Sequence, residues 1–430
     1  MQDQTFNSMT RWKISIAAVA IHLSIGSVYA WSVFVKPLQT LHGWSKPELT
    51  WTFSIAIVML GLSAAFGGSW MERNGPHKSA RISGICFGTG VIGAGLAAYT
   101  GSLWLLYATY GIIGGIGLGM GYISPVSTLL KWFPDKRGLA TGMAVFGFGA
   151  GALIAGPVAT TLIEALGVPV TFWIMGTTYL VVLLTAARVL RFPPKDYRPE
   201  GWDPATAKIR GYRASRDYEL NEAIRTPQFW LLWVLFFLNI SAGIMLISLA
   251  SPMAQEIVGM TAVQAGVMVG LMGIFNGAGR LLWSSSSDIM GRAITYGTMF
   301  VLQIALFALL PGFKSTALFM AAFFIIMTCY GGGFATCPAF IADLFGSLRA
   351  GAIHGVILTA WSAAGIFGPT LGATIKEWTN SYTSALLVIS ATLVVALGST
   401  IAIEFSLRRK TAARVARASA TPEPILDKVE

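Results

Sequence analysis

The chain has 430 residues, of which 54% are hydrophobic and 11% are charged, and its formal net charge at pH 7 is +11. So few polar residues cannot cover a water-soluble globule of this length. The composition therefore excludes an ordinary soluble enzyme or binding domain and predicts an integral membrane protein. No nucleic-acid partner is needed to explain the charge, because the basic residues follow a pattern that membrane insertion imposes.

Twelve apolar runs of about 20 residues, each long enough to cross a bilayer, follow one another along the chain. They begin near Trp12, Pro47, Ser79, Leu103, Gly138, Val168, Gln228, Ala262, Ala293, Ser315, Ala350 and Tyr382. The predicted fold is an all-α membrane protein of twelve transmembrane helices. The first run has no small-residue cleavage site, so we expect a retained helix and not a signal peptide.

The basic residues are distributed unevenly between the two sides of the membrane. With a cytoplasmic N-terminus, the outer loops hold only Lys36, Lys46, Lys314 and Lys376, and Arg280 lies within a span. All other basic residues then fall on the inner side. This positive-inside asymmetry predicts that both termini are cytoplasmic, and the expected location is a bacterial inner (plasma) membrane.

The composition divides the chain into four parts. Residues 1–190 are predicted to form an N-terminal six-helix half, 191–227 a charged cytoplasmic linker, 228–405 a C-terminal six-helix half, and 406–430 a basic, disordered cytoplasmic tail. At the end of the linker, residues 218–227 predict a short surface helix before the seventh span.

The two halves repeat each other in sequence. Three landmarks recur in the same order, and the matched segments are Phe133–Arg137 with Phe345–Arg349, Gly156-Pro157 with Gly368-Pro369, and Glu72–Gly75 with Asp288–Gly291. The repeat predicts two six-helix pseudo-repeats around a central cavity.

The three cysteines, Cys86, Cys329 and Cys337, all fall within predicted spans and show no paired metal-ligand spacing. We interpret them as small packing residues. No disulfide, metal site or cofactor is expected, and no arrangement of residues typical of covalent catalysis is present, so the chain is not expected to be an enzyme.

Arg280 interrupts an apolar stretch that runs roughly from residue 262 to 287. An Arg at the centre of a membrane helix costs about 2.5 to 3.5 kcal/mol on insertion scales, so such a residue usually faces a wet cavity or a partner. The alternative is a side chain that reaches back to the interface or pairs with Asp288. Asn276 lies one helical turn earlier on the same face. It is expected to orient the guanidinium, to contact a substrate, or to hydrogen-bond a neighbouring helix.

Two six-helix halves joined by a basic cytoplasmic linker resemble the major facilitator superfamily over nearly the whole chain. The resemblance implies that the halves rock about a central site. The two acid-Gly loops resemble degenerate copies of the superfamily's cytoplasmic gate motif. The gate that this implies would use Glu72, Arg73, Asp288, Arg292, Arg137 and Arg349, with solvated loop charges as the alternative.

Three segments, Trp132–Gly138, Arg225–Trp230 and Phe275–Arg280, together resemble the oxalate/formate antiporter family, which is related to the monocarboxylate transporters. The resemblance implies that Arg280 binds the substrate carboxylate. The oxalate transporter of that family carries a Lys in the eleventh span, where this chain has Trp361. A dianion facing one Arg would leave a carboxylate without a counter-charge, at a cost of several kcal/mol. We therefore expect a monocarboxylate such as lactate, pyruvate or formate.

By the same position-to-position matching, five aromatic residues on four spans line the pocket, although ordinary helix packing explains each one singly. They are Tyr29, Tyr122, Tyr330, Phe334 and Trp361.

The sequence leaves the energy source open between proton symport and anion exchange. Proton-coupled monocarboxylate transporters carry an Asp at the position of Asn276, which cannot titrate. His22 and His354 are the possible proton sites in the spans, with packed or interfacial histidines as the alternative.

Two other functions share this fold. A drug or amphipathic-cation exporter would need an embedded carboxylate, whereas a lone Arg creates the opposite field. A carboxylate sensor that does not transport would pass its signal through the linker or the tail. In either case the protein is expected to act as a monomer in the lipid bilayer.

Overall fold

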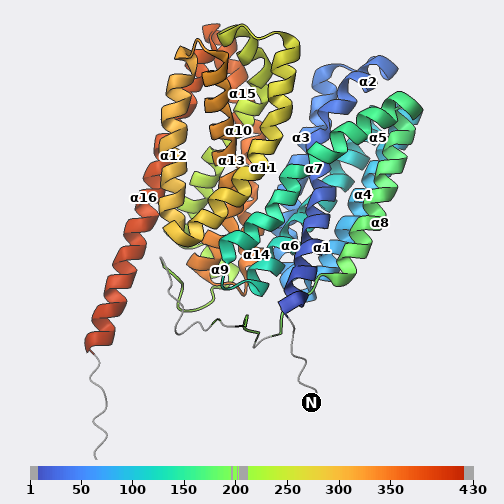
Figure 1. Ribbon diagram of the computed structural model, residues 1–430. Helices are drawn as coiled ribbons and strands as arrows, with labels where there is room; N and C mark the ends of the chain where they lie inside the picture. Colours follow the sequence, from blue (N-terminus) through green and yellow to red (C-terminus); the bar gives the residue numbers. More distant parts are fainter. Residues whose placement is uncertain (1–7, 195–196, 201, 203–211, 421–430) are drawn as a thin grey trace, which may run out of the picture.

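The computed structural model describes residues 8–194, 197–200, 202 and 212–420. Twelve helices in this part of the chain are long and apolar enough to span a membrane. They form two bundles that stand side by side (Figure 1), one from the first half of the chain and one from the second. The predicted all-α membrane fold is confirmed.

The N-terminal bundle consists of α1 (Ser8–Gly26), the 3₁₀ turn η1 (Ser27–Ala30), α2 (Ser32–His42), α3 (Lys46–Asn74), α4 (Pro76–Thr100), α5 (Leu103–Leu106), the π-helical turn η2 (Tyr107–Gly114), α6 (Gly115–Trp132), α7 (Arg137–Leu166) and α8 (Val168–Val189). A short helix, α9 (Leu220–Ala223), lies near the end of the linker. It confirms the surface helix expected before the seventh span.

The C-terminal bundle consists of α10 (Pro227–Val258), α11 (Ala262–Met290), α12 (Arg292–Leu309), the 3₁₀ turn η3 (Leu310–Gly312), α13 (Thr316–Phe345), α14 (Ala350–Ile357), α15 (Thr359–Thr379) and α16 (Tyr382–Ala420). The start of α1, the end of α16 and α9 lie at the same end of the molecule (Figure 1), which we call the linker end. The opposite end is the far end.

The sequence repeat is also a repeat of local structure. Helix α3 begins with a capping box between Ser45 and Glu48, and α11 begins with one between Thr261 and Gln264. The two helices end at Gly75 and Gly291, whose φ angles are 91° and 92°. A positive φ of this size favours glycine, because a Cβ would clash with the backbone. Matched start and stop signals therefore give two helices of the same length and orientation.

Several spans are interrupted near the centre of the molecule. The first span changes to a 3₁₀ turn at Ser27–Ala30, and the eleventh divides at Leu358 into α14 and α15. Tyr29 lies in the first interruption and Trp361 three residues after the second. These interruptions were not predicted. One contains Tyr29 and the other lies one turn before Trp361, and both residues are expected in the site.

The C-terminal tail differs from the prediction. Helix α16 continues without a break to Ala420, so the expectation of disorder from residue 406 was wrong for residues 406–420. Ala and Arg are strong helix formers, and they are frequent between Arg408 and Ala420. Residues 421–430 lie outside the described part of the chain.

Close helix contacts inside each bundle depend on glycine, and Gly117 gives a test. A Cβ on Gly117 of α6 would lie 2.4 Å from the backbone nitrogen of Phe87 on α4. We predict that Gly117→Ala destabilises the protein by about 1 to 3 kcal/mol through overpacking, and lowers its melting temperature in detergent. Gly398→Ala is the matched control, because a Cβ there meets nothing within 4 Å. Equal melting temperatures for the two variants would contradict the packing of α6 on α4.

Candidate functional site

Arg280 lies at the seam between the two bundles and is fully buried. Its Nε donates to Asn276 Oδ1 at 3.2 Å, one turn earlier on α11, and its Nη1 donates to the Val145 carbonyl on α7 at 3.0 Å. Its Nη2 has no hydrogen-bond partner among the described residues. The guanidinium is therefore held by both halves and still has an unused donor. It does not snorkel to the surface.

Aromatic rings from both halves surround this guanidinium. Its central carbon lies 5.2 Å from the ring centre of Phe334 on α13 and 5.9 Å from that of Phe148 on α7. The Trp361 ring lies 4.6 Å from Phe334 and 5.5 Å from Tyr122 on α6. At these separations the rings pack edge to face around the charge and exclude water.

The remaining predicted aromatic residues belong to the same group. Tyr29 packs 5.1 Å from Phe148 and 6.4 Å from Trp361, and Tyr330 packs 5.3 Å from Phe334. The structure thus brings together the residues expected to line the pocket, and we call this set the aromatic cluster: Tyr29, Tyr122, Phe148, Tyr330, Phe334 and Trp361. Its role in substrate binding stays a prediction.

The aromatic cluster contains polar atoms that the described residues leave without hydrogen bonds. They are the hydroxyls of Tyr29 and Tyr122 and the indole Nε1 of Trp361, in addition to Arg280 Nη2. A buried polar group without a partner costs about 1 to 3 kcal/mol. All four groups can donate a hydrogen bond, so a ligand that accepts hydrogen bonds and carries negative charge would relieve this cost.

Phe148 was not predicted, although it contacts Tyr29, Tyr122 and Trp361 and faces Arg280. It stands between Gly147 and Gly149 on α7. The signal that could have identified it is an aromatic residue flanked on both sides by glycine, where the glycines let neighbouring helices approach closely.

The two predicted histidines flank Tyr122. His22 on α1 is buried, and its ring contacts the carbonyl oxygens of Ala144 and Tyr122. His354 on α14 is also buried, with its ring centre 5.9 Å from that of Tyr122. Neither ring nitrogen of His354 has a hydrogen-bond partner in the described part of the chain.

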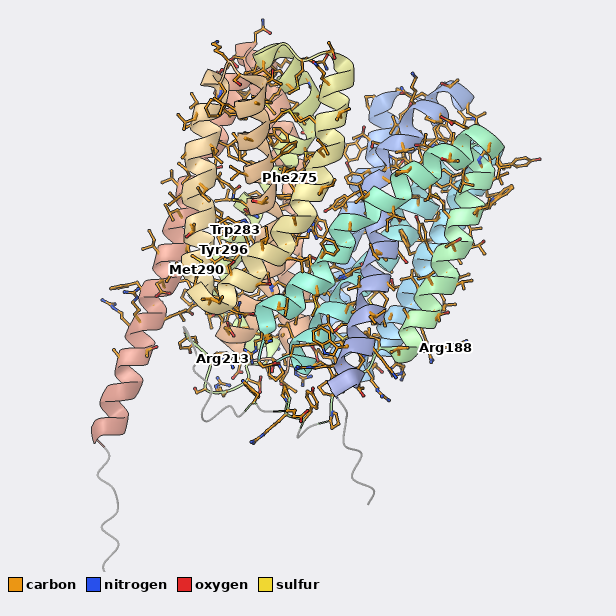
Figure 2. The ribbon with its side chains drawn as sticks, in the orientation of Figure 1. Arg188, Arg213, Phe275, Trp283, Met290 and Tyr296 are labelled. Carbon is orange, nitrogen blue, oxygen red and sulfur yellow. The ribbon has the colours of Figure 1, made fainter. Side chains whose placement is uncertain are left out.

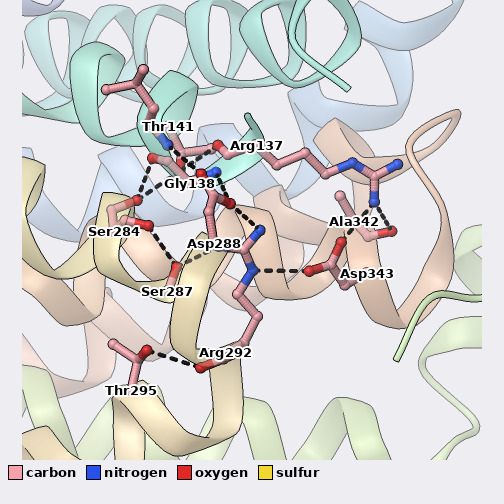
Figure 3. Close-up of polar contacts among 12 residues, drawn as sticks. Arg137, Gly138, Thr141, Ser284, Ser287, Asp288, Arg292, Thr295, Ala342 and Asp343 are labelled. Carbon is pink, nitrogen blue, oxygen red and sulfur yellow. Dashed lines mark hydrogen bonds and ion pairs between the residues drawn. The ribbon is translucent and has the colours of Figure 1, made fainter. Parts of the chain in front are cut away.

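Asp288 connects the two halves at the linker end (Figure 3). Its carboxylate accepts hydrogen bonds from the backbone nitrogens of Gly138 at 2.9 Å and Leu139 at 3.1 Å, in the first turn of α7. Arg292 donates to the same carboxylate at 2.7 Å. A carboxylate at a helix N-terminus is stabilised by the free backbone N–H groups and by the helix dipole.

Glu72 makes the corresponding contact in the other direction. Its carboxylate accepts from the backbone nitrogen of Gly351 at 3.0 Å, in the first turn of α14, and from Ser127 Oγ at 2.7 Å, and it pairs with Lys131. Each acid of the repeated acid-Gly loops therefore binds the N-terminus of a helix in the opposite half. The predicted gate residues Glu72 and Asp288 thus lie where the two halves meet, Glu72 between α3 and α14 and Asp288 between α11 and α7.

A third contact across the halves centres on Asp343 near the end of α13 (Figure 3). Arg137 of α7 donates to it at 2.8 Å, and Arg292 donates to its other oxygen at 2.8 Å. The sequence interpretation missed Asp343. The repeat could have identified it, because a shift of 212 residues relates the two halves and places Asp343 at the position that corresponds to Lys131.

Arg349 and Arg73 have other partners. Arg349 donates to Glu219 beside α9 at 3.0 Å, and Arg73 Nε donates to the Ser69 carbonyl of its own helix at 3.3 Å. The part of these two residues in a gate stays a prediction.

The end of the linker lies against these contacts between the halves. The backbone nitrogen of Ala214 donates to the Asp343 carbonyl at 2.8 Å, and Arg213 reaches the Pro134 carbonyl of the N-terminal half at 3.4 Å. Figure 2 shows Arg213 at the linker end, below the two bundles. The described linker residues therefore touch both halves.

Two six-helix halves that meet at a buried charge and are joined across one end have the architecture of a membrane transporter. The family model described as Major Facilitator Superfamily matches residues 14–369 and 240–427. The chain belongs to this superfamily.

Known proteins similar to the chain agree with the resemblance inferred from its motifs. The oxalate:formate antiporter of Oxalobacter formigenes is 29% identical over 390 residues, 90% of this chain and 90% of that protein. Monocarboxylate transporter 12 of Mus musculus is 21% identical over 386 residues, 84% of this chain and 79% of that protein. The crystal structure of the transporter FucP in its outward conformation matches with a TM-score of 0.72 at 13% identity, covering 91% of this chain and 98% of that one, and shows the fold alone.

The contacts of Asp343 predict that it holds the linker end closed. Asp343→Asn removes the charge that Arg137 and Arg292 share. Loss of one hydrogen bond between charged groups costs about 1.5 kcal/mol, so we expect the open population to rise roughly tenfold. The measurement is the rate at which a membrane-impermeant maleimide, added from the linker side, labels the buried Thr141→Cys variant after the native cysteines are replaced.

The matched control is Glu404→Gln, which removes an exposed ion pair with Arg408. The same labelling rate in the Asp343 and Glu404 variants would show that Asp343 does not hold the two halves together at the linker end.

Proposed function

We propose that this protein is a secondary transporter that moves a small monocarboxylate of the lactate, pyruvate or formate type by alternating access. The proposal depends on the fully buried Arg280, whose Nη2 lies inside the aromatic cluster and has no hydrogen-bond partner among the described residues. A carboxylate bound there accepts hydrogen bonds from a fixed, planar donor and neutralises the buried charge.

The charge of the site favours one carboxylate per substrate. Among Arg280, Asn276 and the aromatic cluster, Arg280 is the only charged side chain. Trp361 lies fully buried against Phe334, at the position where the resemblance implies a Lys in the oxalate transporter. An apolar ring there suits a short alkyl tail, whereas a second carboxylate would lie in a low-dielectric site without a counter-charge.

The packing of α7 and α11 supports an outward-facing state, with the linker end on the cytoplasmic side. Near the linker end, a Cβ on Gly138 would lie 2.0 Å from the Ser284 carbonyl, and one on Gly142 would lie 3.0 Å from the Arg280 carbonyl. Toward the far end, a Cβ on Gly270 or Gly273 of α11 would meet nothing within 4 Å. The seam is tight on one side of Arg280 and open on the other, as alternating access requires.

The positive-inside distribution supports cytoplasmic termini, and the proposed location is a bacterial inner membrane. Transport is driven by proton symport or by anion exchange, and the transporting unit is a monomer. A cation exporter is disfavoured, because the buried charge of the site is positive. A carboxylate sensor that does not transport would bind the same ligands, so an uptake assay separates it from a transporter.

Uptake by purified protein in liposomes tests this proposal. We expect uptake of lactate, pyruvate or formate to exceed that of oxalate, and Arg280→Lys to reduce it roughly 10- to 100-fold, since hydrogen bonds between charged groups contribute about 1.5 to 3 kcal/mol. Arg409→Gln, which changes an exposed Arg outside the site, is the control. Binding without uptake would favour the sensor, and equal or better oxalate uptake would contradict the single-charge site.

Trp361 gives an independent test of substrate charge. Trp361→Lys places a second cation beside the aromatic cluster, so the ratio of oxalate to pyruvate uptake is expected to rise at least tenfold. Trp361→Phe is the matched control, because it removes the indole without adding charge. An unchanged ratio in the Lys variant would remove residue 361 from the binding site.

A further inference from the structure

His22 occupies a position that only a protonated imidazole satisfies completely. Its Nδ1 contacts the carbonyl oxygen of Ala144 on α7, and its Nε2 lies 3.1 Å from the carbonyl oxygen of Tyr122 on α6. Carbonyl oxygens only accept hydrogen bonds, and a neutral imidazole has a single N–H to donate. In the neutral form one ring nitrogen therefore faces a carbonyl lone pair, whereas the imidazolium donates to both oxygens.

The groups that face His22 belong to several helices. Tyr122 of α6 lies 5.1 Å away between ring centres, His354 of α14 lies beyond it, and α11 contributes the charge of Arg280. Helix α7 presents the apolar ring of Phe148 at 6.2 Å, and Tyr179 of α8 contacts Ser27. Burial of the imidazole among these groups opposes a positive charge on His22 most strongly, and the fixed charge of Arg280 opposes it further while the site is empty.

A carboxylate bound to Arg280 changes this balance. The anion cancels the part of this opposition that comes from Arg280, and the two carbonyl oxygens then stabilise a proton on His22. By linkage, a proton on His22 strengthens carboxylate binding by the same factor. We propose that His22 binds the proton that accompanies the substrate, one proton for each carboxylate, so that the protein is a proton symporter; this inference rests on the proposed function.

His354 does not offer the same environment. Its ring nitrogens lack hydrogen-bond partners among the described residues, so no acceptor there stabilises a protonated ring. His22, in contrast, links α1 to the backbone of Tyr122 and to Ala144, one turn before Phe148. Helix α6 carries Tyr122 and helix α7 carries Phe148, and both residues belong to the aromatic cluster. A proton on His22 therefore draws α6 and α7 toward the same side chain.

The test compares net transport with exchange in liposomes, using pyruvate. In the unmodified protein, an imposed inward proton gradient should drive accumulation of pyruvate and acidify the lumen. His22→Gln should lose at least about tenfold of the gradient-driven accumulation, while exchange of external labelled pyruvate for internal pyruvate continues. His42→Gln is the matched control, because the His42 ring also contacts a backbone carbonyl, that of Ala98, but at the far end.

A second measurement does not depend on the folding of a variant. Addition of pyruvate to the purified unmodified protein in weak buffer near pH 7.5 should remove about one proton per protein from solution, as reported by an indicator dye. No proton uptake on saturating binding would overturn the inference.

The liposome measurements also distinguish the role of His22, proton symport and the proposed transport of a carboxylate. Gradient-driven accumulation that survives in His22→Gln, or that is lost in His354→Gln and not in His22→Gln, would overturn the role of His22. Pyruvate exchange without any response to the proton gradient in the unmodified protein would overturn proton symport and leave the proposed function intact. No carboxylate movement of any kind would reject the proposed function itself.

Discussion

One buried positive charge constrains the rest of the structure. Arg280 is removed from water, yet the described residues supply only two neutral oxygen acceptors, from Asn276 and Val145. One acceptor belongs to the helix of Arg280 and the other to the opposite half. The charge is therefore partly satisfied, and its position depends on contact between the two bundles. A fixed charge in this state is suited to a transient anionic partner, because a permanent carboxylate would fill the site.

At the linker end, carboxylates bound to helix N-termini join the two bundles. Glu72 and Asp288 each bind the N-terminus of a helix in the other half, as the repeat requires. The repeat places Lys131 and Asp343 at corresponding positions, but the two residues have opposite charges and different partners. Lys131 pairs with Glu72 inside the N-terminal half, whereas Asp343 binds Arg137 across the halves and Arg292 in its own half. At the linker end, the side of the molecule where α7 meets α11 therefore carries an additional ion pair between the halves.

Much of the fold and part of the site are readable from the sequence, because membrane insertion and helix capping act locally. Run length predicts twelve spans, and the repeat predicts matched helices such as α3 and α11. The cost of Arg280 and the family resemblance together point to the central residues that the structure brings close. Phe148 and Asp343 escape this approach, because their importance arises from contacts between helices distant in sequence. The interruptions at Tyr29 and Leu358, and the helical residues 406–420, depend on local backbone geometry that apolar periodicity does not specify.

We propose that Arg280 Nη2, which has no partner in the described part of the chain, receives the single carboxylate of the substrate. The most direct measurement is calorimetric binding of lactate and of lactamide, its neutral isostere, to the purified protein. The account predicts saturable, one-to-one binding of lactate and at least tenfold weaker binding of lactamide, with the difference abolished in Arg280→Gln. Equal affinity for the acid and the amide would show that the buried charge does not bind the substrate.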